Sequence, residues 1–192
     1  MKNRIKSLAI VALVALFTFS FTVIDGGKKE VNTDKSSVVW KGYKVTGSHV
    51  GAISIESGNL IFDRNTLTGG EFVIDMTSIT VTDLDGEYKG KLEGHLKSDD
   101  FFGVANHPKA NLVFKNVKSS GKNSYTVIGD LTIKGKTNSI TFNVSIYGSK
   151  ANVALKIDRT KYGVEYNSTS FFENLKDKAI YDEFDLTADL EF

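Results

Sequence analysis

Ile140-Thr-Phe-Asn-Val-Ser-Ile146 and Phe184-Asp-Leu-Thr-Ala-Asp-Leu-Glu-Phe192 are the two stretches that decide the fold. In both, an apolar residue stands at every second position, with a polar residue between. Because neighbouring side chains of a β-strand point to opposite faces, each stretch predicts a strand with one face in a core and the other in water. A parallel strand covered on both faces would be apolar throughout, so the alternation favours an antiparallel sheet.

Strand-like stretches also occupy most of the remaining chain. They lie at 38–45, 50–56, 59–63, 70–76, 111–117, 125–133 and 151–158. Together with the two alternating stretches they make nine strands, or eight if Gly58 is a bulge in one bent strand from 50 to 63. Eight strands close a small barrel that leaves no edge exposed. We therefore predict an all-β fold, an eight-stranded antiparallel β-barrel.

Two segments depart from the strand pattern. The segment 85–100 carries residues at helical spacing, namely Tyr88, Leu92, His95 and Leu96. Ser170-Phe-Phe-Glu173 has the form of a capping box and is followed by Leu175 and Ala179, which predicts a short helix near 171–179. One or two short helices are thus expected outside the sheet or over an opening of the barrel.

The first 24 residues have the layout of a secretory signal peptide. Lys2, Arg4 and Lys6 precede a mostly apolar run from Leu8 to Ile24, which is shorter than the ~20 residues that a membrane span prefers. We predict a signal peptide at 1–24, a linker at 25–34 and one domain at 35–192. The protein is then periplasmic or otherwise exported after cleavage, and a retained membrane anchor is the alternative.

Charge and cysteine content exclude several classes of function. The 192 residues contain no cysteine, which excludes disulfides, thiol catalysis and cysteine-ligated zinc. Cleavage after residue 24 would remove three basic residues and no acid, leaving 21 basic and 23 acidic residues and a net charge of −2. A near-neutral domain lacks the basic surface that nucleic-acid binding requires, so no nucleic-acid partner is expected.

The sequence shows no constellation of residues typical of an active site. The three histidines, His49, His95 and His107, are not spaced like a pair of metal ligands. Neither a nucleophile elbow nor a glycine motif for binding phosphate is present. Adjacent acids such as Asp99-Asp100 are typical of helix caps and solvated turns. We therefore expect neither an enzyme nor a metal site.

The side chains on the apolar faces of the strands are the remaining candidates for a site. They are Trp40, Phe72, Ile74, Leu112, Phe114, Phe142, Val144, Leu155, Phe184 and Leu186. Alternation alone leaves two possibilities open, because an eight-stranded barrel is either filled by such side chains or hollow enough for one small ligand.

Five segments, in order along the chain, resemble the YceI-like family of exported lipid-binding proteins. They are His49-Val-Gly51, His95-Leu-Lys-Ser-Asp-Asp-Phe-Phe102, His107-Pro-Lys-Ala-Asn-Leu-Val-Phe114, Tyr125-Thr-Val-Ile-Gly-Asp-Leu-Thr-Ile-Lys-Gly135 and Arg159-Thr-Lys-Tyr-Gly163. The resemblance extends over about residues 35 to 192, which is the whole predicted domain.

The resemblance implies a lipocalin-like barrel whose apolar tunnel holds an isoprenoid lipid or an isoprenoid quinone. The ten side chains named above would form the tunnel wall, with no required cofactor and no catalytic residue. A homodimer and transient contact with a membrane are compatible with the same interpretation.

Two other functions remain as alternatives. A filled barrel would be an interaction domain that binds a protein partner on its outer face. An enzyme acting on the lipid would have only His95, Asp99 and Arg159 as candidate catalytic residues.

Overall fold

The computed structural model describes residues 27–192, and the predicted signal peptide at 1–24 lies outside the described residues. The elements of this part of the chain are β1 (Lys28–Glu30), η1 (Thr33–Lys35), β2 (Ser37–Lys44), β3 (Gly47–Asp63), β4 (Thr66–Val81), α1 (Gly86–Lys97), β5 (Lys109–Gly121), β6 (Ser124–Ile133), β7 (Lys136–Tyr147), β8 (Lys150–Asp158), η2 (Arg159–Tyr162), η3 (Lys176–Lys178) and β9 (Glu183–Glu191), where η marks a 3-10 helix.

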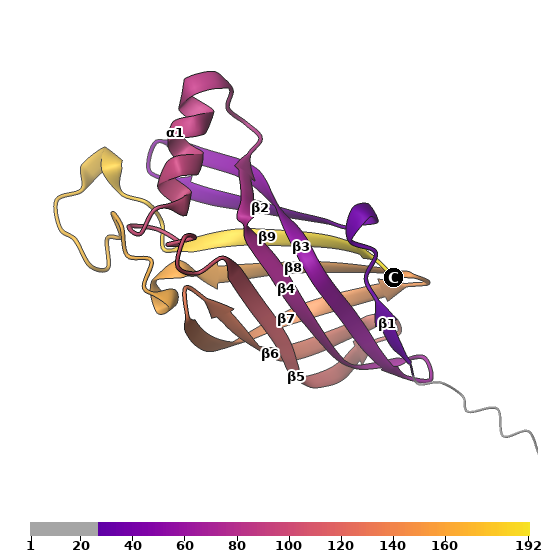
Figure 1. Ribbon diagram of the computed structural model, residues 1–192. Coiled ribbons are helices and arrows are strands. Elements are labelled where there is room, and N and C mark those ends of the chain that lie inside the picture. Colours follow the sequence, from indigo (N-terminus) through magenta and orange to yellow (C-terminus); the bar gives the residue numbers. More distant parts are fainter. Residues whose placement is uncertain (1–26) are drawn as a thin grey trace, which may run out of the picture.

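The long strands β2 to β9 close into a barrel (Figure 1). Each pairs antiparallel with the next along the chain, and β9 returns to pair with β2. The connections are therefore up-and-down, with α1 in the one between β4 and β5 and turns or loops in the others, and the sheet closes on itself. The predicted eight-stranded antiparallel, lipocalin-like barrel is confirmed.

The stretch from 50 to 63 forms one strand, as the eight-strand count requires, but its bulge is not at Gly58. The 17-residue β3 shifts register against β4 at three places, of which the one between Ile55 and Ser57 lies nearest to Gly58, and Gly58 itself pairs regularly with Phe72. A Cβ atom at Gly58 would overlap the Phe72 ring. The glycine therefore serves close packing on the inner face, while the bend lies just before it.

The segment predicted as a linker, 25–34, contains part of the sheet. Lys28 to Glu30 form β1, which pairs antiparallel with β3 opposite Ile61, Leu60 and Asn59. Val31 is buried, and its backbone N–H donates to the Gly58 carbonyl at 2.9 Å. Backbone pairing and one buried valine thus attach the first described residues to the barrel.

The helix predicted within 85–100 is present as α1, and Glu93 attaches it to β4. The Glu93 carboxylate accepts hydrogen bonds from the Thr80 hydroxyl at 2.5 Å and the Val81 N–H at 2.9 Å, and these bonds lower its pKa. Leu96 is buried, whereas Tyr88 is exposed, so only the C-terminal half of the predicted apolar face packs on the barrel.

The prediction of a helix near 171–179 is wrong. The Ser170 hydroxyl donates to Asp182 Oδ2 at 2.5 Å, so it does not cap a helix. Asn174 and Lys176 have left-handed backbone angles, which interrupt an α-helix. Only the short η3 forms.

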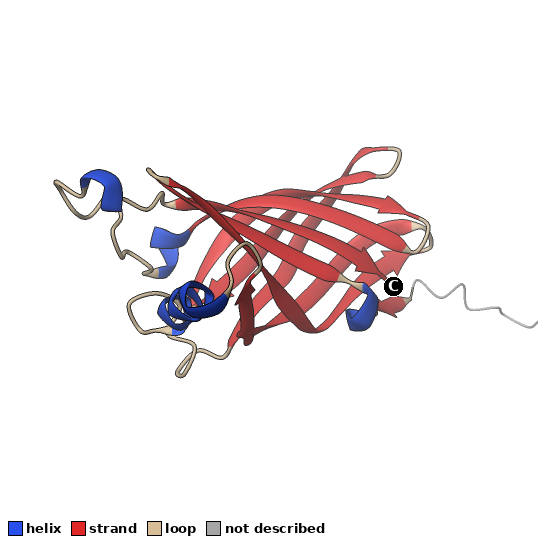
Figure 2. Ribbon diagram, turned by 90° about the horizontal axis from the view of Figure 1, so that it is seen from above, coloured by secondary structure: helices blue, strands red, loops and turns tan. Residues whose placement is uncertain are grey.

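The two ends of the barrel differ (Figure 2). One end, here called the mouth, carries α1, the loop 98–108 and the long connection 159–182 between β8 and β9. The opposite end, here called the closed end, carries the short turns after β3, β5 and β7, together with β1 and the C-terminus.

Candidate functional site

The closed end of the barrel is filled with side chains. Leu60, Val127 and Val144 are fully buried, and the rings of Phe62 and Phe192 lie 5.5 Å apart between centroids. None of these residues borders the internal cavity. Val144, predicted as part of the tunnel wall, is therefore a packed core residue, because its position along β7 places it beyond the end of the hollow region.

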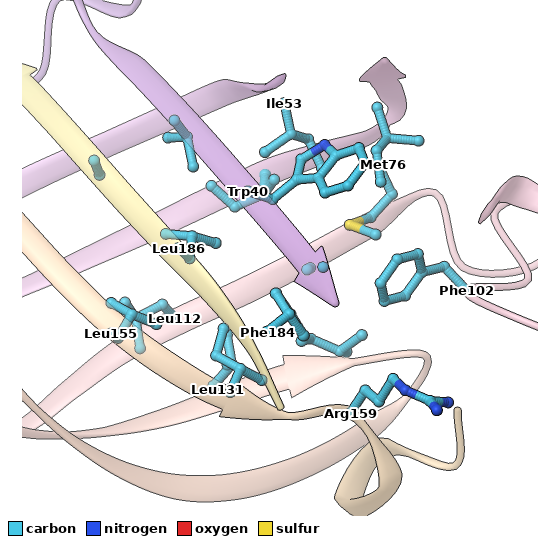
Figure 3. Close-up of a pocket in the computed structure, with 18 of the residues that line it drawn as sticks. Trp40, Ile53, Met76, Phe102, Leu112, Leu131, Leu155, Arg159, Phe184 and Leu186 are labelled. Carbon is cyan, nitrogen blue, oxygen red and sulfur yellow. The ribbon is translucent and has the colours of Figure 1, made fainter. Parts of the chain in front are cut away.

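The rest of the barrel encloses a cavity of about 170 Å³. The other nine predicted wall residues all border it, namely Trp40, Phe72, Ile74, Leu112, Phe114, Phe142, Leu155, Phe184 and Leu186. Figure 3 shows several of them pointing into one common space from different strands. The barrel is thus neither wholly filled nor wholly hollow.

The cavity is long and its wall is hydrocarbon. On β9 the successive inward residues Phe184, Leu186, Ala188 and Leu190 all border it, a span of about 20 Å at ~3.4 Å per residue. An engineered apolar cavity of about 150 Å³ stays dry and binds benzene. A space of this size with an apolar wall is accordingly suited to an apolar ligand and unsuited to water.

Glycines on the inner face make room for the large aromatic side chains. Trp40 pairs with Gly51 across β2 and β3, and a Cβ atom at Gly51 would overlap the indole ring. A Cβ atom at Gly70 would come within 3.0 Å of the Phe114 ring. Gly58 has the same relation to Phe72. Because these three glycines have no side chain, the aromatic rings can lie against the barrel wall, and the centre of the barrel stays free.

Aromatic side chains from the loop 98–108 cover the cavity at the mouth. Phe101 and Phe102 are buried and border the cavity, and Phe102 also contacts Phe184 at a centroid distance of 6.5 Å. The ring of His95, on α1, meets Phe101 at 5.5 Å and Tyr166 at 4.5 Å. A series of edge-to-face ring contacts therefore joins α1, the cavity and the connection between β8 and β9.

Arg159 fastens this connection to the barrel. Its side chain is 3% exposed and donates to three backbone carbonyls, through Nη1 to Val164 at 2.7 Å, Nε to Tyr181 at 3.0 Å and Nη2 to Ile180 at 3.0 Å. Burial lowers the pKa of Arg159, and Asp182 opposes that effect from 3.7 Å. Figure 3 shows the guanidinium turned away from the other wall residues, so only its apolar stem faces the cavity side.

The cavity reaches the surface beside the end of β2. Tyr181 borders the cavity and is also 55% exposed. Its N–H donates to the Tyr43 carbonyl at 2.9 Å, and the Val45 N–H donates to the Ala179 carbonyl at 3.2 Å. The last residues of the connection thus lie along β2 and form the rim of the opening.

The candidate catalytic residues do not form a site. Within residues 27–192, no hydrogen bond or ion pair joins His95, Asp99 and Arg159 to one another. His49 instead contacts Asp83 at 3.2 Å, and His107 packs beside Gly135. In the same part of the chain no three His, Asp or Glu side chains cluster as a metal site, and no helix is long and apolar enough to cross a membrane.

Sequence reasoning did not foresee the roles of Arg159 and Tyr181 at the mouth. The Arg159 side chain meets carbonyls as far as 22 residues along the chain, and the Tyr181 N–H meets the carbonyl of Tyr43 in β2, contacts for which periodicity gives no signal. Phe101 and Phe102 lay within a motif quoted for the family resemblance, but their function as a cover over the cavity depends on the fold.

Fold and cavity together define a small up-and-down β-barrel with an apolar internal cavity. The sequence matches the YceI-like domain over residues 30–192, and the chain belongs to this family.

Curated relatives support the same assignment over part of their length. A UPF0312 protein of Staphylococcus epidermidis is 34% identical over 110 residues, which are 48% of this chain and 61% of that protein. A UPF0312 protein of Staphylococcus aureus is 41% identical over 86 residues, which are 39% of this chain and 47% of that protein. The chain thus spans about half the length of the curated relatives that it matches.

Solved structures share the fold. Burkholderia cenocepacia BcnA superposes with a TM-score of 0.66 at 23% identity, covering 83% of this chain and 98% of its own. A polyisoprenoid binding domain from Saccharophagus degradans, implicated in plant cell wall breakdown, gives a TM-score of 0.60 at 16% identity, with 84% and 95% covered. The YceI protein of Campylobacter jejuni gives 0.55 at 18% identity, with 100% and 90% covered.

Proposed function

We propose that the protein holds one apolar lipid, an isoprenoid or an isoprenoid quinone, in its barrel cavity and serves as an exported carrier or store. The observation that carries this proposal is the cavity, because its wall is hydrocarbon over about 20 Å and it reaches the surface beside Tyr181. The polyisoprenoid binding domain of Saccharophagus degradans has the same fold, which supports the isoprenoid class.

The energetics favour a long apolar tail over a polar ligand. Burying each methylene contributes about 0.8 kcal/mol, so ten carbons contribute roughly 8 kcal/mol before association costs. A charged head group inside the cavity would find no free charge to pair with, since the Arg159 guanidinium is engaged with the carbonyls of Val164, Ile180 and Tyr181 and the one buried unpaired donor among the described wall residues is the neutral Trp40 indole N–H. The head group is therefore expected at the mouth.

The protein is proposed to bind its ligand without transforming it. Within residues 27–192, the cavity wall carries no Ser, Thr, Lys, His, Asp or Glu side chain; the Arg159 guanidinium is engaged with backbone carbonyls, and the unpaired Trp40 indole N–H is a donor, not a nucleophile. The same arrangement agrees with the family, whose fold is that of a binding protein.

Lipid content and Trp40 fluorescence test the proposal directly. An organic extract of the purified protein, examined by mass spectrometry, should contain an isoprenoid lipid. Trp40 is the only tryptophan of the chain and borders the cavity, so a benzoquinone with a ten-carbon isoprenoid tail should quench its fluorescence in delipidated protein.

A matched pair of substitutions separates cavity binding from surface adsorption. Leu186→Gln places an amide on the cavity wall and should weaken quenching, whereas Val39→Gln changes an exposed residue on the outer face of β2 and should not. A lipid-free extract together with unquenched Trp40 would refute the proposal and favour the protein-binding alternative.

Export is proposed on the signal-peptide layout of residues 1–24. Protein recovered from the cell envelope should begin between about residue 19 and residue 27 on sequencing of its N-terminus. Intact Met1 on cytoplasmic protein would contradict this.

A further inference from the structure

The connection between β8 and β9 presents two adjacent phenylalanines to solvent. Ser168 and Ala179 are buried and fix the two sides of the connection, and the tip between them, 169–178, projects beyond the barrel at the mouth (Figure 1). Phe171 is 52% exposed and Phe172 is 48% exposed. Adjacent exposed aromatic rings on a projecting loop are costly in water and typical of a contact surface.

These rings belong to a larger apolar surface around the opening of the cavity. Ser170 bonds to Asp182, which holds the start of the tip beside Tyr181, and Val45 bonds to Ala179 at its other side. Val45 and Tyr181 are each 55% exposed. We call Val45, Phe171, Phe172 and Tyr181 the mouth patch. Because Tyr181 also borders the cavity, the mouth patch is continuous with the cavity wall.

The charges of the tip indicate what kind of surface the mouth patch fits. Its two acids, Glu173 and Asp177, are balanced by two bases, Lys176 and Lys178, so the tip is neutral. A partner selected by opposite charge is not favoured by such a tip. A neutral apolar surface that accepts aromatic rings at its boundary with water is the interfacial region of a lipid bilayer.

We propose that the mouth patch docks the open end of the barrel on an uncharged phospholipid bilayer, with Phe171 and Phe172 inserted at the interface. This inference rests on the proposed function, because docking places the cavity opening against the source or the destination of its ligand. A lipid tail then passes between bilayer and cavity along Tyr181 without crossing water.

Binding of the purified protein to phosphatidylcholine vesicles, measured by flotation, tests the docking. Phe171→Ser combined with Phe172→Ser should lower the partition coefficient about tenfold or more, since tenfold corresponds to about 1.4 kcal/mol and two partly buried rings exceed that. Ile128→Ser combined with Tyr147→Ser removes two exposed apolar residues away from the mouth and should leave binding unchanged. Circular dichroism of each variant should match that of the unaltered protein.

Salt and lipid charge distinguish apolar docking from electrostatic adsorption. Binding to phosphatidylcholine should be the same at 0.1 M and 1 M salt, because screening acts on charges and not on apolar contact. Binding only to anionic vesicles, or loss of binding at high salt, would overturn the inference. So would an equal loss in the two double variants.

The vesicle-binding experiment can fail independently of the test of lipid binding in the cavity. If the protein carries an extractable lipid and Trp40 responds to the quinone, yet the protein does not bind vesicles, the docking inference fails while the proposed function stands. Lipid loading in cells that depends on Phe171 and Phe172 without vesicle binding would indicate a protein donor and would likewise overturn it.

Discussion

The barrel is divided into a filled end and a hollow end. This division predicts that replacing leucine by alanine lowers the free energy of unfolding by different amounts at the two ends. Leu60 lies in the filled end and is fully buried, whereas Leu131 is also buried but borders the cavity. Changing leucine to alanine removes three carbons in both places. A difference between the two losses of unfolding free energy therefore reports how completely each leucine side chain is surrounded by other atoms.

The magnitudes follow from the packing. Three carbons lose about 2.4 kcal/mol of transfer free energy at ~0.8 kcal/mol each. In the filled end they also leave a void of roughly 80 Å³, which adds about 2 kcal/mol at ~24 cal/mol per Å³. Leu60→Ala should thus lower the free energy of unfolding by about 4 kcal/mol. Leu131 already faces empty space where it borders the cavity, so Leu131→Ala should lower the free energy of unfolding by only about 2 kcal/mol without ligand.

Urea unfolding of the delipidated protein, with and without the ten-carbon quinone, measures both effects. Ligand that binds only the folded state should stabilise the Leu60→Ala variant as much as the unaltered protein. It should stabilise the Leu131→Ala variant less, because part of its binding wall is missing. Equal losses in the two ligand-free variants, or a larger loss for Leu131→Ala, would refute the idea that the cavity persists in solution.

Three further predictions concern the glycine that packs against Phe72, the arginine that fastens the mouth and the pH dependence of Glu93. Gly58→Ala forces the Phe72 ring toward the cavity and should weaken quinone binding, whereas Gly90→Ala in α1 meets open space and should stabilise by up to about 1 kcal/mol in urea unfolding. Arg159→Met leaves three carbonyls without their donor and should cost roughly 1–3 kcal/mol, with faster proteolysis within 164–181. Glu93 has a folded pKa below its ordinary 4.5, so its stabilising contribution is present above pH 4.5 and is lost as pH falls through the folded pKa. Hydrogen exchange of α1 should therefore accelerate on acidification.

Each of these has an outcome that contradicts it. Unchanged quinone affinity in Gly58→Ala would mean that Phe72 moves without narrowing the cavity. Proteolysis of Arg159→Met at the rate of the unaltered protein would show that backbone pairing alone fastens the mouth. An acid-dependent exchange of α1 that persists in Glu93→Gln would assign the pH dependence to another group.

The barrel and most of its cavity wall could be predicted from the sequence because both depend on a local property. Successive side chains of a strand alternate between faces, so the inward positions of β7 and β9 are readable from the chain itself. How far an inward side chain lies along the barrel axis depends on the register of every neighbouring strand. Phe142 and Val144 are therefore alike in sequence, although one borders the cavity and the other fills the closed end.

The errors at β1 and at 171–179 have the same origin in contacts distant along the chain. Lys28 to Glu30 show no alternation and are exposed, and they form a strand only because β3 offers free backbone groups at 59–61. Ser170 has the sequence context of a helix cap, but Asp182 accepts its hydroxyl hydrogen instead. Local propensity was overridden at both places by partners that periodicity does not reveal.

The position of β1 links the export proposal to the docking proposal. β1 lies at the closed end, whereas the tip 169–178, which carries Phe171 and Phe172, projects from the mouth at the opposite end (Figure 1). Only about three residues separate the apolar run ending at Ile24 from Lys28, and four steps of chain span at most ~14 Å. The nine residues of β9 extend about 30 Å along the barrel wall at ~3.4 Å each. A chain held in a bilayer by residues 8–24 would therefore present its closed end to that bilayer and hold the mouth away from it. Docking of the mouth on the same bilayer requires the domain to turn over, which a cleaved chain can do and a chain so tethered cannot.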